Sequence, residues 1–203
     1  EGDKVYRFTI SLGAATSTGD REGEIIETQP VPPLDPAQIA LVLAGFVGES
    51  LQTPPMYSAI KQDGQPLYRL ARAGKTVERQ PRPIRIECLE LLGQSEPHTL
   101  DCRVTCGKGT YIRSLARDMG RALGTAAHVT SLRRVAVGPF TEAHMISLEN
   151  LTELGHKAPG GDAKTGASLP IETVLDGIPA LAIDEEQARR LKLGQAVLLR
   201  GAN

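Results

Sequence analysis

The segment whose residue types are best suited to a chemical role is G-K-G-T-Y-I-R-S-L, residues 107–115. It lies where a predicted strand meets a predicted helix. Its glycines allow the backbone to turn tightly and to approach a ligand. A helix that begins here offers free N–H groups to an anion, and Arg113 can present a two-pronged donor to a carboxylate or phosphate. The pattern is not G-x-x-x-x-G-K-[ST], which excludes a P-loop nucleotide site. These residues alone leave two interpretations open, an anion-binding turn and a plain helix start.

The cysteines and histidines offer little metal chemistry. Cys88, Cys102 and Cys106 are an odd number with no disulfide framework, which is typical of a reducing compartment. Cys102 and Cys106 are spaced C-x3-C, but the four histidines are scattered along the chain. We therefore expect buried, strand-borne thiols rather than a metal site.

Charge is unevenly distributed along the chain. The formal net charge is −1, but residues 57–134 hold 14 Lys and Arg against 7 Asp and Glu. The remainder is acidic. A basic middle can attract phosphates through its local field despite the overall balance, so a nucleic-acid partner stays open. The alternative is an ordinary solvated surface.

Residue periodicity predicts the elements that position these groups. Apolar alternation predicts strands over 4–12, 24–27, 84–92, 99–105 and 129–137, and helical spacing predicts helices from Pro36, over 66–74, over 110–123 and over 148–154. Asp35 is the expected N-cap of the first helix. In the helix over 110–123, Arg113, Arg117 and Arg121 repeat every four residues and should share a ridge. Strands and helices mixed without regular βαβ alternation indicate an α+β fold.

Other features limit the organisation of the chain. Its 203 residues include no apolar run of the roughly 18 residues that span a membrane, and residues 1–4 do not resemble a signal peptide. Residues 158–167 contain Gly, Pro and Lys without periodicity, which predicts a linker. There is no initiator Met, so we expect the chain to start inside a longer protein.

Several segments resemble one family. K-G-T-Y-I-R-S-L resembles the arginine motif of the pseudouridine synthases. D-K-V-Y-R, Q-T-P-P-M-Y-S-A-I-K, G-Q-P-L-Y-R-L-A-R-A-G and A-H-V-T-S-L-R-R resemble the TruB branch, in the family's order and with compatible spacing. The resemblance is strong over about residues 1–155 and weak in the tail.

The resemblance implies a fold and a domain plan. It implies a mixed, mainly antiparallel sheet with flanking helices over residues 1–157, with a thumb-like insert at about 57–78. Residues 158–176 would be a linker. Residues 177–203 resemble the start of a PUA domain, a small β domain that binds RNA.

The resemblance also implies a covalent mechanism. In the family an aspartate attacks the target uridine, and the base detaches, rotates and rejoins through carbon. That aspartate lies in a G-x-L-D-P-x-A-x-G motif upstream of the segment that matches D-K-V-Y-R, and this chain has no such motif. Leu34-Asp35-Pro36 is a poor substitute, because it lies downstream of Tyr6 at a good helix start. We therefore expect the chain alone to be inactive.

The remaining site residues carry over one by one. Tyr6 matches the tyrosine that stacks on the flipped base and helps to move its proton. Arg113 matches the arginine that pairs with the catalytic aspartate, and Asp20 matches an acidic position near that arginine. Tyr111 and Leu132 match positions that line the uracil pocket. The thumb-like insert should contact RNA phosphates through its basic side chains, Lys61, Arg69, Arg72 and Lys75.

The resemblance thus implies an isomerase that converts uridine 55 in the T-stem-loop of tRNA to pseudouridine. It implies a cytoplasmic monomer with no metal, no organic cofactor and no membrane. Two alternatives are a guide-RNA-dependent relative that modifies ribosomal RNA and a non-catalytic protein that binds or folds tRNA. The thumb-like insert argues against the guide-RNA-dependent relative, since a stand-alone enzyme needs its own RNA-binding surface.

Overall fold

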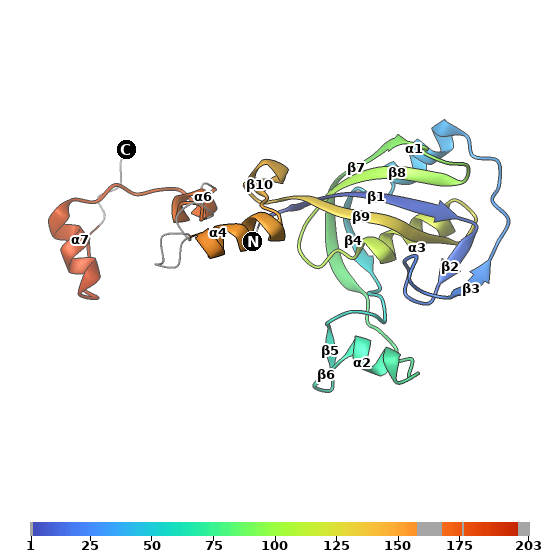
Figure 1. Cartoon of the computed structure of the whole chain (residues 1–203), viewed down its shortest axis with the longest axis horizontal. Coiled ribbons are helices and arrows are strands. Elements are labelled where there is room, and N and C mark those ends of the chain that lie inside the picture. The colour runs from blue at the N-terminus through green and yellow to red at the C-terminus, as the bar shows by residue number, and fades with distance from the viewer. Residues whose placement is uncertain (1, 158–167, 176, 199–203) are drawn as a thin grey trace. The chain divides into compact units, whose positions relative to one another are not determined.

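The computed structural model describes residues 2–157, 168–175 and 177–198. The chain divides into two compact units, Glu1–Ser147 and Leu148–Asn203, which are described separately. In the first unit, a six-stranded sheet has the order β10-β9-β1-β8-β7-β4, and all neighbouring pairs are antiparallel (Figure 1). Its strands are β1 (Lys4–Leu12), β4 (Gly48–Gln52), β7 (Arg82–Gly93), β8 (Thr99–Cys106), β9 (Ala127–Val137) and β10 (Phe140–Thr141).

Two helices cover one face of this sheet. The helix α3 (Ile112–Ala122) packs against β9 and β1, and α1 (Pro36–Ala44) packs against β7 and α3. Close packing of α3 depends on Gly120, since a Cβ there would lie 2.6 Å from the Cβ of Ala127. The side chain of Asp35 accepts a hydrogen bond from the Ala37 N–H at 3.2 Å, as expected for an N-cap.

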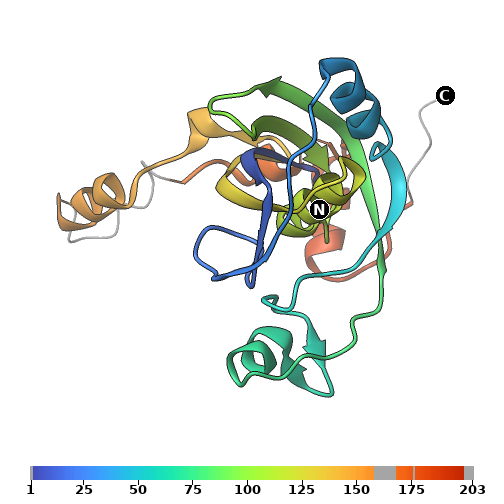
Figure 2. The ribbon, with the colours of Figure 1, turned by 90° about the vertical axis from the view of Figure 1, so that its right-hand side faces the viewer.

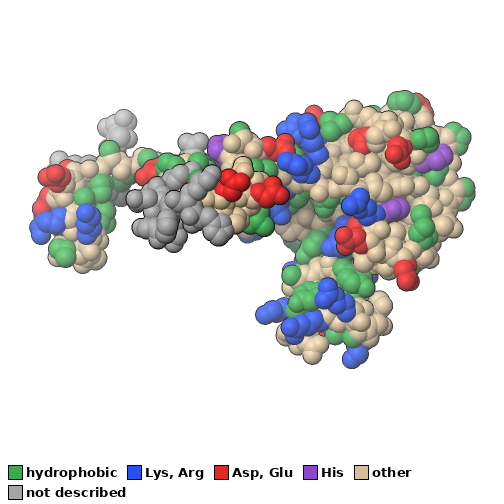
Figure 3. All heavy atoms as spheres, in the orientation of Figure 1, with side chains coloured by type: hydrophobic (Ala, Val, Ile, Leu, Met, Phe, Trp, Pro, Cys, Tyr) green, Lys and Arg blue, Asp and Glu red, His purple; other side chains and the backbone are tan. Residues whose placement is uncertain are grey.

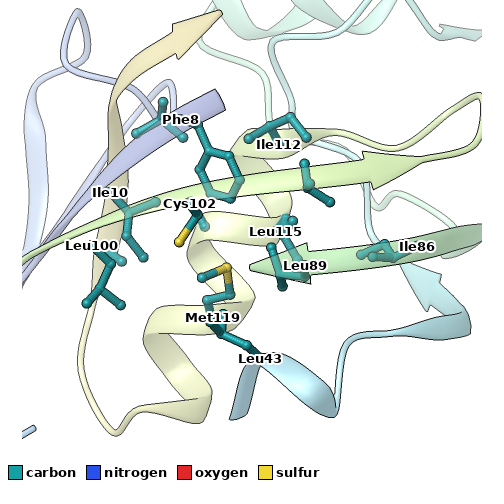
Figure 4. Close-up of a cluster of buried hydrophobic side chains, with 14 of the residues drawn as sticks. Phe8, Ile10, Leu43, Ile86, Leu89, Leu100, Cys102, Ile112, Leu115 and Met119 are labelled. Carbon is teal, nitrogen blue, oxygen red and sulfur yellow. The ribbon is translucent and has the colours of Figure 1, made fainter. Parts of the chain in front are cut away.

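The core lies between the sheet and these helices. Alternate residues of β1 and β8, such as Phe8, Ile10, Leu100 and Cys102, point toward α3 (Figure 4). From the helices, Leu43, Ile112, Leu115 and Met119 close the other side. Burial raises the pKa of the Cys102 thiol to about 12, so this thiol behaves as an apolar side chain.

Two excursions leave the sheet. The strands β2 (Ala14–Thr16) and β3 (Ile25–Thr28) form a hairpin whose β2 lies against β9. Residues 57–78 form a second segment outside the sheet. It contains the short strands β5 (Lys61–Gln62) and β6 (Gln65–Pro66) and the helix α2 (Leu67–Arg72). Figure 2, like Figure 1, shows the β5–β6–α2 segment extending away from the sheet.

A short 3₁₀ helix, η1 (Glu142–His144), follows β10. The second unit contributes α4 (Leu148–Lys157), α6 (Ile171–Leu175) and α7 (Glu185–Lys192). Asp184 caps α7, because its side chain accepts from the Gln187 N–H at 2.8 Å while the Gln187 side chain accepts in return. Within the described ranges, no helix is both long and apolar enough to cross a membrane.

The structure confirms the α+β fold and its mainly antiparallel sheet, and it corrects several details. The helix α3 begins at Ile112 rather than Thr110, and α4 extends beyond residue 154. Cys88 is exposed, contrary to the expectation of buried thiols, because it lies next to a register shift in β7. The expected linker at 158–167 lies outside the described residues.

Candidate active site

Arg113, near the start of α3, makes hydrogen bonds to two separate segments of the site. Nη1 of Arg113 donates to the Thr18 carbonyl at 2.9 Å and to Oδ2 of Asp20 at 3.2 Å. Its Nη2 donates to the Tyr57 carbonyl at 2.7 Å. The guanidinium therefore joins the loop after β2 to the segment that leads into residues 57–78. A planar fork can serve both directions at once, which a single ammonium cannot.

Asp20 is itself held in place from several sides. Its Oδ1 accepts from Oγ1 of Thr18 at 2.5 Å and from the Glu22 N–H at 3.2 Å. Its carbonyl accepts from Oγ1 of Thr16 at 2.6 Å, and its backbone forms a bridge to Val129 of β9. The ion pair with Arg113 is about three-quarters shielded from solvent on both side chains. The loop thus presents a pre-ordered carboxylate to the arginine.

A pocket of about 510 Å³ lies beside this ion pair, lined by residues of the β2–β3 hairpin, α3 and the segment around residues 55–79. The ridge of α3 faces it, because Arg113, Arg117 and Arg121 all contribute to its wall, as expected from their spacing. Lys75 and Arg79 add two more cations, and Glu27 is the acidic residue in the lining. Such a pocket attracts an anion.

Arg79 is a partly buried cation in the wall of this pocket. Burial lowers its pKa, and the nearby Arg117 lowers it further. Its Nη1 donates to the Pro54 carbonyl at 3.2 Å, while its buried Nε has no hydrogen-bond partner. Sequence reasoning missed Arg79, and its position in a polar loop gave no signal.

The predicted base-stacking tyrosine lies on β1, outside the wall of this pocket. Tyr6 pairs in register with Val104 of β8 and Arg134 of β9, and the Arg134 guanidinium lies 5.4 Å from its ring centroid. Leu132, predicted to line the uracil pocket, is opposite Phe8 and 47 % exposed. Sequence reasoning did not anticipate Arg134 beside Tyr6.

Tyr111 is the residue just before α3, where its backbone takes the N-cap position. Its N–H and carbonyl are both hydrogen-bonded by the side-chain amide of Gln52, at 2.9 and 3.2 Å. Neither Tyr111 nor the other predicted uracil-pocket residue, Leu132, lines the cation-rich pocket. The structure therefore brings Arg113 and Asp20 together and leaves the predicted uracil-binding residues outside that cavity.

Basic side chains cover the β5–β6–α2 segment. Lys61, Arg69, Arg72 and Lys75 are all exposed, and Figure 3 shows Lys and Arg side chains over this segment. The Arg72 guanidinium lies 5.6 Å from the ring centroid of Tyr68, which orients it. Lys75 also lines the pocket beside Arg113, so the basic surface reaches the site.

Comparison with known proteins identifies the family. The model of the TruB family pseudouridylate synthase N-terminal domain matches residues 1–112, and the model of the tRNA pseudouridylate synthase B C-terminal domain matches residues 113–176. The chain belongs to the TruB family of pseudouridine synthases. The join between the two TruB matches falls at Arg113, so the contacts of this arginine connect both matched regions.

Similar TruB-family proteins include tRNA pseudouridine synthase B of Bradyrhizobium diazoefficiens, 48 % identical over 99 % of this chain and 58 % of the relative. The same enzyme of Burkholderia lata is 46 % identical over 98 % of this chain and 60 % of the relative. The chain thus spans a little over half the length of these relatives. A solved Cbf5–Nop10–Gar1 complex contains a chain with 26 % identity and a TM-score of 0.67, covering 95 % of this chain and 49 % of that one.

Proposed function

We propose that this chain supplies the main part of a tRNA pseudouridine synthase that acts on uridine 55 in the T-stem-loop. The observation that supports this proposal most directly is the Asp20–Arg113 ion pair, which lies beside a pocket lined by cations. This pair occurs in a chain of the TruB family. The relatives at 45–48 % identity are named tRNA pseudouridine synthase B, which favours tRNA as the substrate.

The chemistry requires a carboxylate nucleophile held ionised and aimed at a flipped uridine. In the reaction the bond from N1 to the ribose breaks, a bond from C5 to the ribose forms, the C5 hydrogen leaves as a proton, and N1 takes up a proton. Arg113 would orient the catalytic carboxylate, and Asp20 would fix Arg113 from its other side. Tyr6, with Leu132 on the neighbouring strand and Tyr111 before α3, would hold the base by stacking and apolar contact.

The nucleophile that the family resemblance implies is not among the residues of this chain. Asp35 does not fill that role, because its carboxylate caps α1. The assay must therefore use the full-length protein as encoded.

RNA would be held by the basic segment between residues 57 and 78. Lys61, Arg69, Arg72 and Lys75 are exposed along it and suit contacts to phosphates, which position RNA without reading its sequence. Such contacts to RNA phosphates favour an enzyme that acts without a guide RNA. We further propose a cytoplasmic monomer in which residues 1–157 form the catalytic domain, 158–176 connect, and 177–203 open a PUA-like RNA-binding domain.

The test is release of tritium from a T-stem-loop RNA labelled at C5 of uridine, with the protein as encoded and no guide RNA. Release at uridine 55, together with loss of release when that uridine is replaced by cytidine, would support the proposal. RNA binding without release would instead favour the non-catalytic tRNA-binding alternative, and release that requires a guide RNA would favour the other enzyme class.

A further inference from the structure

The end of β4 is fixed to the start of α3 by a buried amide. Gln52 is 4 % exposed, and its Oε1 accepts from the Tyr111 N–H at 2.9 Å. Its Nε2 donates to the Tyr111 carbonyl at 3.2 Å. Both hydrogen-bonding capacities of one backbone residue are therefore engaged by one side chain that lies 59 positions away in the sequence.

This contact fixes the N-cap residue of a helix that has no side-chain cap. Tyr111 occupies the N-cap position of α3, and its side chain makes no capping hydrogen bond. The Tyr111 carbonyl also accepts the first helical bond, from the Leu115 N–H at 3.0 Å. Gln52 thus determines where α3 begins and how the peptide that precedes Arg113 is oriented.

The residues after Gln52 continue the same attachment. The Thr53 carbonyl accepts from Oγ of Ser114 at 2.8 Å and from Nη2 of Arg117 at 3.2 Å. The Tyr57 carbonyl accepts from Arg113. Segment 52–57 is therefore hydrogen-bonded to Tyr111 and to residues in the first two turns of α3.

We propose that Gln52 is a positioning residue, which sets the backbone of Tyr111 and so orients Tyr111 toward the reacting base and Arg113 toward the catalytic carboxylate. The proposal rests on the proposed function of this site. When the backbone of one residue is fixed by hydrogen bonds, the orientation of side chains one or two residues away is fixed with it. A displacement of about 1 Å in a catalytic group can reduce the rate on the order of 100-fold.

Removing the amide should therefore affect chemistry more than RNA binding. In Gln52→Leu, which keeps a similar volume, the Tyr111 N–H and one lone pair of its carbonyl lose their partner. We expect the single-turnover rate at saturating protein to fall by at least about 10-fold, with less than about 3-fold change in affinity for T-stem-loop RNA. The matched control is Gln94→Leu, at an exposed position in the β7–β8 loop.

A second variant separates positioning from general stability. In Gln52→Glu, the ionised carboxylate can accept from the Tyr111 N–H but cannot donate to the Tyr111 carbonyl, whereas the protonated form does both. Burial raises a carboxyl pKa above its ordinary value of about 4.3. The rate of Gln52→Glu relative to wild type should therefore rise as the pH falls from about 8 to about 5, and that of Gln52→Leu should stay flat.

The experiment measures these rates by tritium release with the protein as encoded, alongside amide hydrogen exchange of residues 108–114 in the 203-residue chain. Faster exchange there in Gln52→Leu, but not in Gln94→Leu, is the expected result. Wild-type rate in Gln52→Leu, a flat pH ratio in Gln52→Glu, or unchanged exchange overturns the proposal. If the wild-type protein releases no tritium, the proposed function fails, while the exchange measurement still decides the role of Gln52.

Discussion

Replacing Arg113 by Lys tests the site most sharply, because it keeps the charge and removes the fork. The guanidinium reaches Thr18 and Asp20 through Nη1 and Tyr57 through Nη2. One ammonium cannot occupy both nitrogen positions, so we expect Lys to keep the partners of Nη1, Asp20 and the Thr18 carbonyl, and to lose the bond from Nη2 to the Tyr57 carbonyl.

The expected loss of stability follows from the bond to the Tyr57 carbonyl. A hydrogen bond from a charged donor contributes about 1.5 to 3 kcal/mol, and the partial exposure of this side chain places the bond toward the low end. We therefore expect Arg113→Lys to lower the free energy of unfolding by about 1 to 2 kcal/mol. Urea unfolding of the 203-residue chain, followed by tyrosine fluorescence, measures this change.

The effect on catalysis should be larger than the effect on binding. In the protein as encoded, Arg113→Lys should reduce single-turnover tritium release by at least roughly 100-fold, equivalent to about 2.7 kcal/mol of transition-state stabilisation. The affinity for RNA should change little, since phosphate contacts elsewhere dominate it. Arg85→Lys is the control, because Arg85 is an exposed strand residue paired with Glu87.

Two results would refute this reasoning. Near-normal turnover in Arg113→Lys would mean that charge alone matters. If Arg113→Lys and Arg113→Ala both lost RNA affinity while keeping turnover, Arg113 would be a phosphate clamp rather than a partner of the catalytic carboxylate.

Four further predictions concern RNA binding, the cysteines and the core. Replacing Arg69, Arg72 and Lys75 by Ala should reduce the slope of log affinity against log salt concentration by about 0.7 to 0.9 for each phosphate that these side chains neutralise. The slope is measured by titrating T-stem-loop RNA at several salt concentrations, and an unchanged slope would rule out these phosphate contacts. Iodoacetamide should alkylate exposed Cys88 well before Cys102, whose thiol has a pKa of about 12. Because that pKa is raised in the folded state, its contribution to stability is complete below about pH 9 and is lost as the pH rises toward about 12; Cys102→Ala should flatten this alkaline loss in urea titrations. Gly120→Ala should lower the free energy of unfolding by about 1 to 3 kcal/mol, since its Cβ would meet Ala127, and a stability gain would contradict the close packing of α3 on β9.

Strong periodicity made much of the fold predictable. Alternation over residues 4–12 predicted β1, and the repeat of Arg113, Arg117 and Arg121 predicted the ridge of α3 that lines the pocket. By contrast, β4 was missed, because Gly48–Gln52 has no apolar alternation and is ordered by pairing with β7. The start of α3 was placed two residues early, because a side chain on β4 holds Tyr111 outside the helix.

The candidate site was less accessible to sequence reasoning than the fold. The family resemblance pointed to Asp20 and Arg113, which are in contact, although their catalytic roles stay predictions. The other partners of Arg113 are the backbone carbonyls of Thr18 and Tyr57. Every residue has such a carbonyl, so no pattern of side chains can reveal which ones will face the guanidinium.

The most direct test of the proposed function is tritium release from C5-labelled T-stem-loop RNA by the protein as encoded, in the absence of guide RNA. We predict release of one tritium per RNA at uridine 55, reduced at least roughly 100-fold by Arg113→Lys. Absence of release by the wild-type protein, or equal release by Arg113→Ala, would contradict the assignment of a pseudouridine synthase site around Arg113.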